Sequence, residues 1–357
     1  MRIIAERNVG ETRAAVFDGD RPIELHVERW SERRSRAVRG EVFRGRVVSI
    51  DKVLNGAFVE LGKGPDGFLP LGKAGRIEGL HNGASIGVQI SREAFQDKGP
   101  TLSPFELEED GAAPEAIATA PPIDERLAMG FEAPIRTPKE AGIDLDPVFE
   151  AALEPKVPLS GGGHLVIEPV TALTAIDVDA AGRHAQSGGQ KFILDLNKAA
   201  AREAGRQIRL RGIGGVVAID FLPLKKRADQ GALDQALKGA FRGDPAKIDI
   251  APSSRFAIVE LARQRLGRSL YEMCWERFGV LSVETSALAA LRRLEREGRA
   301  HSGKPITLEA GSEIFAWLDA DPVGWQKSMT NRLGARFQLK ENAALDPRAF
   351  SVDAGRE

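Results

Sequence analysis

The stretches TAIDVDAAG, residues 174–182, and GVVAIDFL, residues 215–222, share the ending Ala-Ile-Asp and decide how the centre of the chain folds. Both are apolar or β-branched runs that predict buried strands. The first sets two carboxylates, Asp177 and Asp179, two residues apart, so that in a strand they point to the same face. The second ends at Asp220. Because an ionised carboxylate is costly to bury without a partner, these aspartates need an explanation.

The segment between the two runs, FILDLNKAAAREAGRQIR at 192–209, favours a helix by its alanines and long polar side chains. Strand, helix and strand in this order form a β-α-β unit, whose two strands lie parallel in one sheet. Since open α/β sheets place ligands at the C-terminal ends of strands, we expect Asp177 and Asp220 to come together. Their partner is either an arginine, such as Arg209 or Arg211, or a divalent cation such as Mg²⁺.

Composition excludes several classes of protein. A length of 357 residues suits two or three domains, and the net charge of −1 gives no bulk argument for nucleic acid or membrane. Cys274 is the one cysteine, which excludes internal disulfides and a Cys-rich zinc site and fits a reducing cytoplasm. We see no apolar run long enough to span a bilayer and no leader. We therefore expect a soluble cytoplasmic protein.

The N-terminal part reads as strands, then a basic run, then a barrel. The first 28 residues predict two or three strands. Residues 29–46 hold seven arginines against two glutamates, which is either a solvated loop or a set of phosphate contacts. The short β-rich runs that follow, broken by glycine turns, predict a small closed β-barrel of the OB type. Phe43, Phe58 and Phe68 could stack on RNA bases there, although each taken alone is better explained as a core residue.

The remaining segments predict a linker and further α/β structure. Residues 101–125 contain seven acids and no bases and read as a flexible linker. We expect helices at 229–241 and 255–266 around a strand at 247–252. After Trp275, a helix at 281–299, a strand, two short helices and a last strand at 336–342 predict a small α+β domain. His81, His164, His184 and His301 show no metal-ligand spacing, and no catalytic triad can be argued from them.

At this point the residues carry a resemblance. TALTAIDVDAAG, LNKAAAREAGRQIRLRGIGGVVAIDFL and RFAIVELARQRL, in this order, resemble the catalytic core of the ribonuclease E/G family, and FRGRVVSIDKVLNGAFVELGKGPDGFLPL resembles its S1 RNA-binding domain. The resemblance implies a deoxyribonuclease-I-like subdomain that holds Mg²⁺ on two aspartates, here Asp177 and Asp220. It implies hydrolysis of single-stranded RNA to 5′-phosphate and 3′-hydroxyl ends. The RNA contacts it implies are Phe58, Phe68 and Lys98.

The sequence departs from the family pattern in three places. Asp179 stands where the family normally has Asn, and a carboxylate there repels the scissile phosphate unless it is protonated or faces the metal. CWER, with Cys274 alone, replaces a C-x-x-C zinc motif, so we expect no zinc and no zinc-linked dimer, but a monomer or weak dimer. The fragment APIRTPKEAG resembles a reduced 5′-phosphate sensor with Arg136 and Thr137 as ligands, or is an ordinary Thr-Pro turn.

We therefore expect a multidomain α/β and α+β protein, in which a small OB-type barrel precedes a deoxyribonuclease-I-like catalytic domain and a small C-terminal domain. The expected divisions are N-terminal strands as a ribonuclease-H-like remnant (1–36), S1 barrel (37–103), acidic flexible linker (104–130), reduced sensor (131–158), catalytic domain (159–275) and C-terminal domain (276–357). The expected activity is a Mg²⁺-dependent endoribonuclease, with Mn²⁺ as a possible substitute, acting on single-stranded RNA in RNA processing or decay. Asp177, Asp220 and Asp179 form its catalytic group, and the basic run, Arg209 and Arg211 seat RNA phosphates. The alternatives are a non-catalytic RNA-binding relative and, more weakly, a DNA nuclease.

Overall fold

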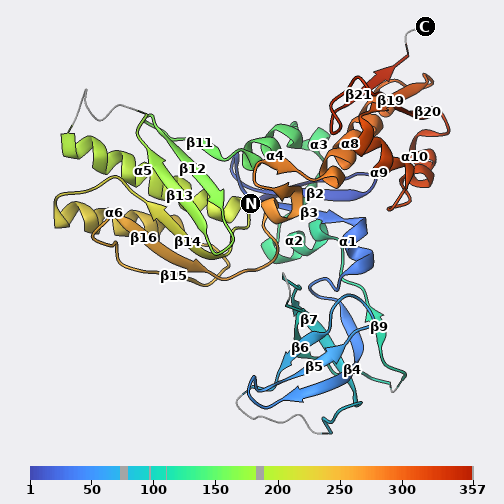
Figure 1. Cartoon of the computed structure of the whole chain (residues 1–357), viewed down its shortest axis with the longest axis horizontal. Helices are drawn as coiled ribbons and strands as arrows, with labels where there is room; N and C mark the ends of the chain where they lie inside the picture. The colour runs from blue at the N-terminus through green and yellow to red at the C-terminus, as the bar shows by residue number, and fades with distance from the viewer. Residues whose placement is uncertain (73–78, 96–97, 110, 182–188, 356–357) are drawn as a thin grey trace. The chain divides into compact units, whose positions relative to one another are not determined.

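The computed structural model describes the chain except for residues 73–78, 96–97, 110, 182–188 and 356–357. It contains two compact units (Figure 1). We call the first the barrel unit; it comprises Gly10–Thr12 and Glu28–Gly130. We call the second the main unit; it comprises Met1–Val9, Arg13–Val27 and Phe131–Glu357. The segments that we expected as the domains 131–158, 159–275 and 276–357 all fall within the main unit.

The barrel unit contains a closed sheet. Strands β5, β6, β8, β7 and β4 are hydrogen-bonded in this order, and β4 pairs again with β5, which closes a five-stranded barrel. Alternate side chains such as Phe43, Val59 and Leu69 fill its interior. The predicted small closed barrel is confirmed, and it is consistent with an OB-type fold. The elements of this unit are α1 (Trp30–Ser35), β4 (Val42–Asp51), β5 (Gly56–Glu60), β6 (Gly67–Pro70), β7 (Ser85–Arg92), β8 (Thr101–Pro104), β9 (Glu115–Ala118) and α2 (Ile123–Phe131).

The acidic segment 104–130 differs from the flexible linker that we expected. Strand β9 pairs antiparallel with β4, and helix α2 follows it. Arg44 of β4 forms an ion pair with Glu115 and donates a 2.9 Å hydrogen bond to the carbonyl of Glu109. One acid of this segment, Glu115, thus finds its partner in the basic run of residues 29–46. Composition alone does not reveal such pairing, because it carries no information about which distant charges meet.

The centre of the main unit is a six-stranded sheet in the order β11-β12-β13-β14-β16-β15. Strands β13 and β14 are parallel and are joined by the long helix α5, so the predicted β-α-β unit is confirmed. Helices α5 and α6 pack side by side against this sheet (Figure 1). The elements are β11 (Lys156–Pro158), β12 (His164–Pro169), β13 (Thr174–Asp179), α5 (Gly189–Leu210), β14 (Gly215–Asp220), α6 (Arg227–Ala240), β15 (Ile248–Ile250) and β16 (Ile258–Arg263).

The prediction of a helix at 255–266 is wrong. Residues Ile258–Arg263 form strand β16, which pairs antiparallel with β14. Burial alternates along it, with Val259 and Leu261 buried and Glu260 exposed between them. A short apolar run fits the period of a strand as well as that of a helix, so the pattern could not separate the two.

The other elements of the main unit come from the N-terminal strands, from residues 135–153 and from the residues after β16. Strands β10, β1, β2 and β3 form a four-stranded sheet, and β20, β19 and β21 form a three-stranded sheet. Strand β21 was not predicted. Within the described residues, no helix combines the length and apolar character needed to cross a bilayer. The elements are β1 (Arg2–Arg7), β2 (Glu11–Asp18), β3 (Arg21–Arg29), β10 (Ile135–Arg136), α3 (Pro138–Ala141), α4 (Leu145–Leu153), α7 (Leu270–Cys274), β17 (Trp275–Arg277), β18 (Val280–Leu281), α8 (Val283–Ala300), β19 (Ile306–Ala310), α9 (Ser312–Asp319), α10 (Trp325–Leu333), β20 (Phe337–Glu341) and β21 (Phe350–Ala354).

Candidate functional site

Two carboxylates stand side by side at the ends of the parallel strands. Asp177 of β13 is in register with Asp220 of β14, and Ile176 is in register with Ile219. The two isoleucines are buried in the core that includes α5. Because side chains alternate along a strand, both aspartates project from the opposite face of the sheet, and both are exposed. The structure thus brings Asp177 and Asp220 together, as the β-α-β pattern predicts.

The electrostatics of this pair favour a cation. Burial raises the pKa of Asp177 above its ordinary value, and the negative charges of Asp220 and Asp179 raise it further. Neighbouring carboxylates therefore repel each other when all are ionised. A bound cation would remove this repulsion, as a divalent ion does when it neutralises the carboxylates that hold it.

Asp179 is held by two neighbours that sequence reasoning did not connect with it. It is in register with His164 of β12, whose Nε2 lies 3.2 Å from Oδ2 of Asp179. The backbone N–H of Ala181 donates a 2.7 Å hydrogen bond to Oδ1. His164 is 13% exposed and Asp179 is 46% exposed. The histidine spacing gave no signal for this pair, because the two residues meet across strands. His184 lies outside the described residues.

A second residue that was not predicted fixes the loop after Asp220. Asn197 of α5 is fully buried. Its Nδ2 donates to the carbonyl of Leu222 at 2.8 Å, and its Oδ1 accepts from the N–H of Leu222 at 3.1 Å. An amide that satisfies both backbone groups of one residue holds the chain there in one path. A buried Asn within a helix full of alanines is the sequence signal that could have identified it.

The residues present fit a Mg²⁺ site of the open kind. Over the part of the chain with described coordinates, no group of three or more His, Cys, Asp or Glu side chains forms a metal cluster. Mg²⁺ does not require one, since it is typically bound by one or two carboxylates, with waters and substrate phosphate completing six oxygens. Asp177 and Asp220 supply two exposed carboxylates on one face. These are the donor atoms that such a site needs.

In the barrel unit, the aromatic residues predicted to bind RNA lie together. Phe58 of β5 and Phe68 of β6 are cross-strand partners, with ring centroids 5.4 Å apart. Both are only partly buried, unlike Phe43, which fills the barrel interior. Lys98 is exposed and forms an isolated bridge with Phe95. The pair Phe58 and Phe68 can therefore offer aromatic surface to a base, whereas Phe43 cannot.

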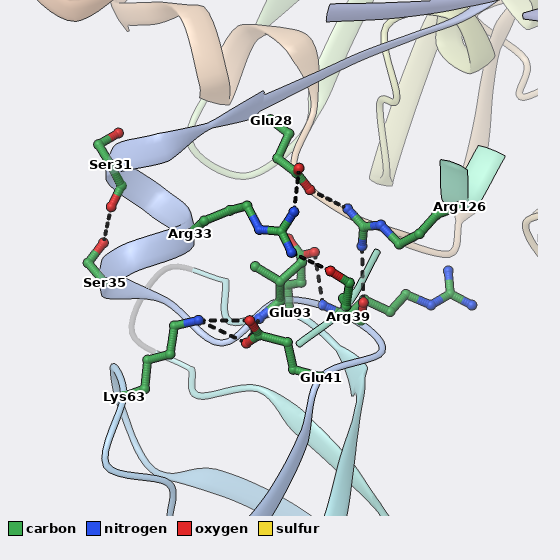
Figure 2. A network of polar contacts seen from close by, with 11 residues as sticks. Glu28, Ser31, Arg33, Ser35, Arg39, Glu41, Lys63, Glu93 and Arg126 are labelled. Atoms are coloured by element: carbon green, nitrogen blue, oxygen red, sulfur yellow. Dashed lines mark hydrogen bonds and ion pairs between the residues drawn. The ribbon is translucent and has the colours of Figure 1, made fainter. Parts of the chain in front are cut away.

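The basic run of residues 29–46 has mainly a structural role within the barrel unit. Figure 2 shows Arg33 and Arg126 converging on the carboxylate of Glu28, with distances of 3.0 and 2.8 Å. Lys63 contacts Glu41 in the same network. Arg36 and Arg46 donate to backbone carbonyls. Most of these guanidinium groups therefore stabilise the barrel unit through hydrogen bonds and ion pairs. This favours neither of the two alternatives that the sequence left open, a solvated loop and a set of phosphate contacts.

The sequence predicts that two other arginines, Arg209 and Arg211, seat RNA phosphates. Arg211 is 0% exposed, so the prediction that it contacts RNA is wrong. Burial, followed by the charge of Arg206, lowers its pKa to about 9. Arg209 donates to Glu24 at 2.8 and 2.9 Å and to the carbonyl of Gly243 at 2.9 Å. Arg209 is thus engaged within the main unit, and its role in seating RNA phosphates stays a prediction.

The expected sensor residues lie at the start of helix α3. Thr137 caps this helix: its Oγ1 accepts from the N–H of Glu140 and donates to Oε2 of Glu140 at 2.9 Å. Arg136 lies exposed on β10. The capping box accounts for Thr-Pro without a ligand. A phosphate at this point would also meet the charge of Glu140, whose pKa is lowered by its hydrogen bonds with Thr137.

Comparison with known proteins finds one family for the central part of the chain. Residues 136–266, which contain Asp177, Asp179 and Asp220, match the model of the ribonuclease E/G family. The chain is 32% identical to ribonuclease E of Haemophilus influenzae over 211 residues, and 38% identical to ribonuclease E of Escherichia coli K12 over 158 residues. The central part of the chain is therefore similar to the ribonuclease E/G family.

The matches to members of the ribonuclease E/G family are partial on both sides. They cover 57% of this chain and 23% of the Haemophilus protein, and 42% of this chain and 15% of the Escherichia protein. A ribonuclease E/G-like protein of Porphyra purpurea is 36% identical over 58% of this chain and 40% of its own length. The chain thus spans less than half of each of these relatives.

Proposed function

We propose that this chain is a Mg²⁺-dependent endoribonuclease that hydrolyses single-stranded RNA and leaves 5′-phosphate and 3′-hydroxyl ends. The observation that carries the proposal is the register of Asp177 with Asp220 on one exposed face of the sheet. The similarity of residues 136–266 to the ribonuclease E/G family supports an endonuclease that acts on RNA. We infer that the sheet bearing this pair is the deoxyribonuclease-I-like part of the chain.

In this proposal each residue near the site has one task. Asp177 and Asp220 hold the metal, with Mn²⁺ as a possible substitute for Mg²⁺. When bound, the ion supplies polarisation of the phosphoryl oxygen and an acidified water. Asn197 fixes the loop after Asp220 by its two hydrogen bonds to Leu222. His164 and Ala181 hold Asp179, so that its carboxylate stays in a fixed place beside the pair.

The barrel unit is proposed to bind the RNA as an S1 domain. Phe58 and Phe68 lie next to each other and are both partly exposed. Stacking on aromatic side chains requires bases that are not already stacked in a duplex, so single-stranded RNA is the expected substrate. Lys98 adds an exposed cation in the same unit. A preference for RNA over DNA of equal length is therefore expected.

A second candidate function is RNA binding without catalysis. The observation that favours it is the third carboxylate, Asp179, beside Asp177 and Asp220, because added negative charge opposes the approach of a phosphate. The contact of His164 with Asp179 weighs against it, since an imidazolium would neutralise that charge. The two functions differ in cleavage and agree in binding.

One experiment separates the two functions. The purified full chain is incubated with a 5′-labelled single-stranded RNA, with Mg²⁺, with Mn²⁺ and with a chelator. The proposal expects cleavage that depends on the divalent ion and yields 3′-hydroxyl ends, which a ligase or polymerase can extend. Binding without cleavage under all conditions would favour the second candidate, and equal cleavage of DNA would favour a general nuclease.

A further inference from the structure

A cavity of about 520 Å³ lies in the main unit between helix α5 and the segment that leads from α4 into β11. Helix α5 covers the buried face of the sheet, on which Ile176 lies. Lys156, which also lines the cavity, is in register with Val166 of β12 and through it with Asp177 of β13, so the cavity lies at the edge strand β11, two strands away from Asp177. None of the residues that line the cavity belongs to the proposed catalytic machinery. Its volume is in the range of pockets that hold small molecules.

Cations dominate the wall of this cavity. Arg21, Lys156, Arg202 and Arg206 line it, against only Glu154 and Glu203 as acids. Glu203 is already neutralised: Arg21 contacts it at 2.8 Å, Arg206 donates to it through Nε at 3.0 Å, and Gln207 donates at 2.9 Å. The remaining charges therefore leave a positive excess in a concave site, where low-dielectric walls strengthen its field.

Two of these cations have no counter-ion among the described residues. Lys156 and Arg202 are both exposed at the cavity, and neither side chain makes a hydrogen bond or ion pair with any residue that the structure describes. Arg202 stands on α5 and Lys156 on β11, so the two approach from different elements. Ser160, which also lines the cavity, adds a hydroxyl donor. A guanidinium, an ammonium and a hydroxyl together match the oxygens of a phosphate group.

A buried arginine lies next to the residues that line the cavity. Arg211 is fully buried, and its Nε donates to Oε1 of Gln207 at 2.6 Å, while Gln207 itself lines the cavity. Neither Nη atom of Arg211 has a hydrogen-bond partner among the described residues. The ring of Tyr271 lies 5.3 Å from its guanidinium carbon, and the charges of Glu203 and Glu154 offset part of the cost of burial. A buried cation with unsatisfied donors is costly, and an anion in the adjacent cavity would reduce that cost.

We propose that this cavity is a phosphate-binding site, in which Lys156, Arg202 and Ser160 contact the phosphate oxygens and Arg206 supports them. The group bound is a phosphate monoester or diester, carried either by a small nucleotide or by the backbone of RNA. The proposal is independent of cleavage, because it requires no residue of the nuclease site.

The test uses the full chain and adenosine 5′-monophosphate as the probe. Binding is followed by calorimetry and by changes in NMR chemical shifts. The double variant R202Q/K156Q removes both unpaired cations and is expected to weaken nucleotide binding at least tenfold. The matched control R242Q/K238Q removes one arginine and one lysine that are exposed on the same unit but do not line the cavity. It is expected to bind within about twofold of the parent, so that a net-charge effect is excluded. Thermal unfolding of both variants checks that the fold is kept.

A second arm identifies the source of the phosphate. The affinity for a ten-nucleotide 5′-hydroxyl RNA is measured for the parent and R202Q/K156Q, with and without the nucleotide. Loss of RNA affinity in the variant and displacement of the nucleotide by RNA assign the site to the RNA backbone. Unchanged RNA affinity assigns it to a free nucleotide. No binding of nucleotide or RNA phosphate at the cavity, or an equal loss in R242Q/K238Q, would overturn the proposal. All affinities are measured with a chelator present, so that neither result depends on whether the chain cleaves RNA.

Discussion

Nε2 of His164 lies 3.2 Å from Oδ2 of Asp179, across the two neighbouring strands β12 and β13. This contact accounts for how a third carboxylate can stand beside Asp177 and Asp220. A histidine within ion-pair distance can neutralise that carboxylate and hold it in one orientation, which the Ala181 N–H reinforces. We therefore treat His164 and Asp179 as one functional pair.

We predict that the effect of substituting His164 depends on the residue at position 179. His164→Ala frees the carboxylate of Asp179 and is expected to lower kcat about tenfold, which corresponds to about 1.4 kcal/mol, with RNA affinity unchanged. In an Asp179→Asn background, the same His164 substitution is expected to have little effect, because no charge is left to neutralise. Cleavage kinetics of the four proteins measure the coupling. An equal loss in both backgrounds would show that His164 acts independently of Asp179.

A second prediction concerns the pKa of Asp177. Burial and the charges of Asp220 and Asp179 raise this pKa, so Asp220→Asn should lower it toward the ordinary value. Carbon NMR titration of the metal-free protein reads it directly. Because the folded value lies above the unfolded one, the contribution of Asp177 to stability is present below the unfolded pKa and is lost as pH rises through the folded pKa. An unchanged titration in Asp220→Asn would mean that the two carboxylates do not interact.

The sequence predicted local order well and distant pairing poorly. The β-α-β unit and the register of Asp177 with Asp220 follow from strand and helix patterns, because adjacent elements of this kind have one preferred arrangement. The contact of His164 with Asp179 does not follow, because it depends on the register of an antiparallel hairpin. The same reason applies to the ion pair of Arg44 with Glu115 and to the pairing of β9 with β4. Both lie in a segment that we expected to be a flexible linker.

The sequence also did not predict which charged side chains are buried. Arg211 stands in the segment RQIRLR with two other arginines, which is typical of a solvated face. In the structure it directly follows α5 and packs on Tyr271 without exposure. Whether the last turn of a helix is covered depends on what docks there, and no local pattern reports this.

The barrel unit gives a prediction on RNA affinity. Phe68→Ala removes a partly exposed ring beside Phe58, and is expected to weaken binding of single-stranded RNA by about 1–3 kcal/mol, the usual range for one stacked base. Phe68→Trp should retain most of the affinity. Fluorescence anisotropy with a labelled RNA measures both. Equal affinity of the alanine variant and the parent would place the RNA elsewhere on the chain.

The basic run gives a prediction that separates stability from binding. Arg33→Gln removes a donor to the largely buried carboxylate of Glu28 and is expected to destabilise the barrel unit by about 1–3 kcal/mol, with RNA affinity unchanged. Arg39 is the matched control, because its side chain is exposed, its guanidinium makes no hydrogen bond or ion pair with any other described residue, and it points away from the network in Figure 2. Arg39→Gln should keep stability and weaken RNA binding, with a smaller salt slope. The opposite assignment of effects would contradict this division.

The central claim is that Asp177 and Asp220 together hold the metal that RNA cleavage requires. The most direct measurement compares cleavage and RNA binding of Asp177→Asn and Asp220→Asn with the parent at saturating Mg²⁺. The account predicts that each variant loses cleavage by at least about a thousandfold, equivalent to about 4 kcal/mol, while RNA affinity and unfolding temperature stay near the parent values. Cleavage by both variants at the rate of the parent would contradict it.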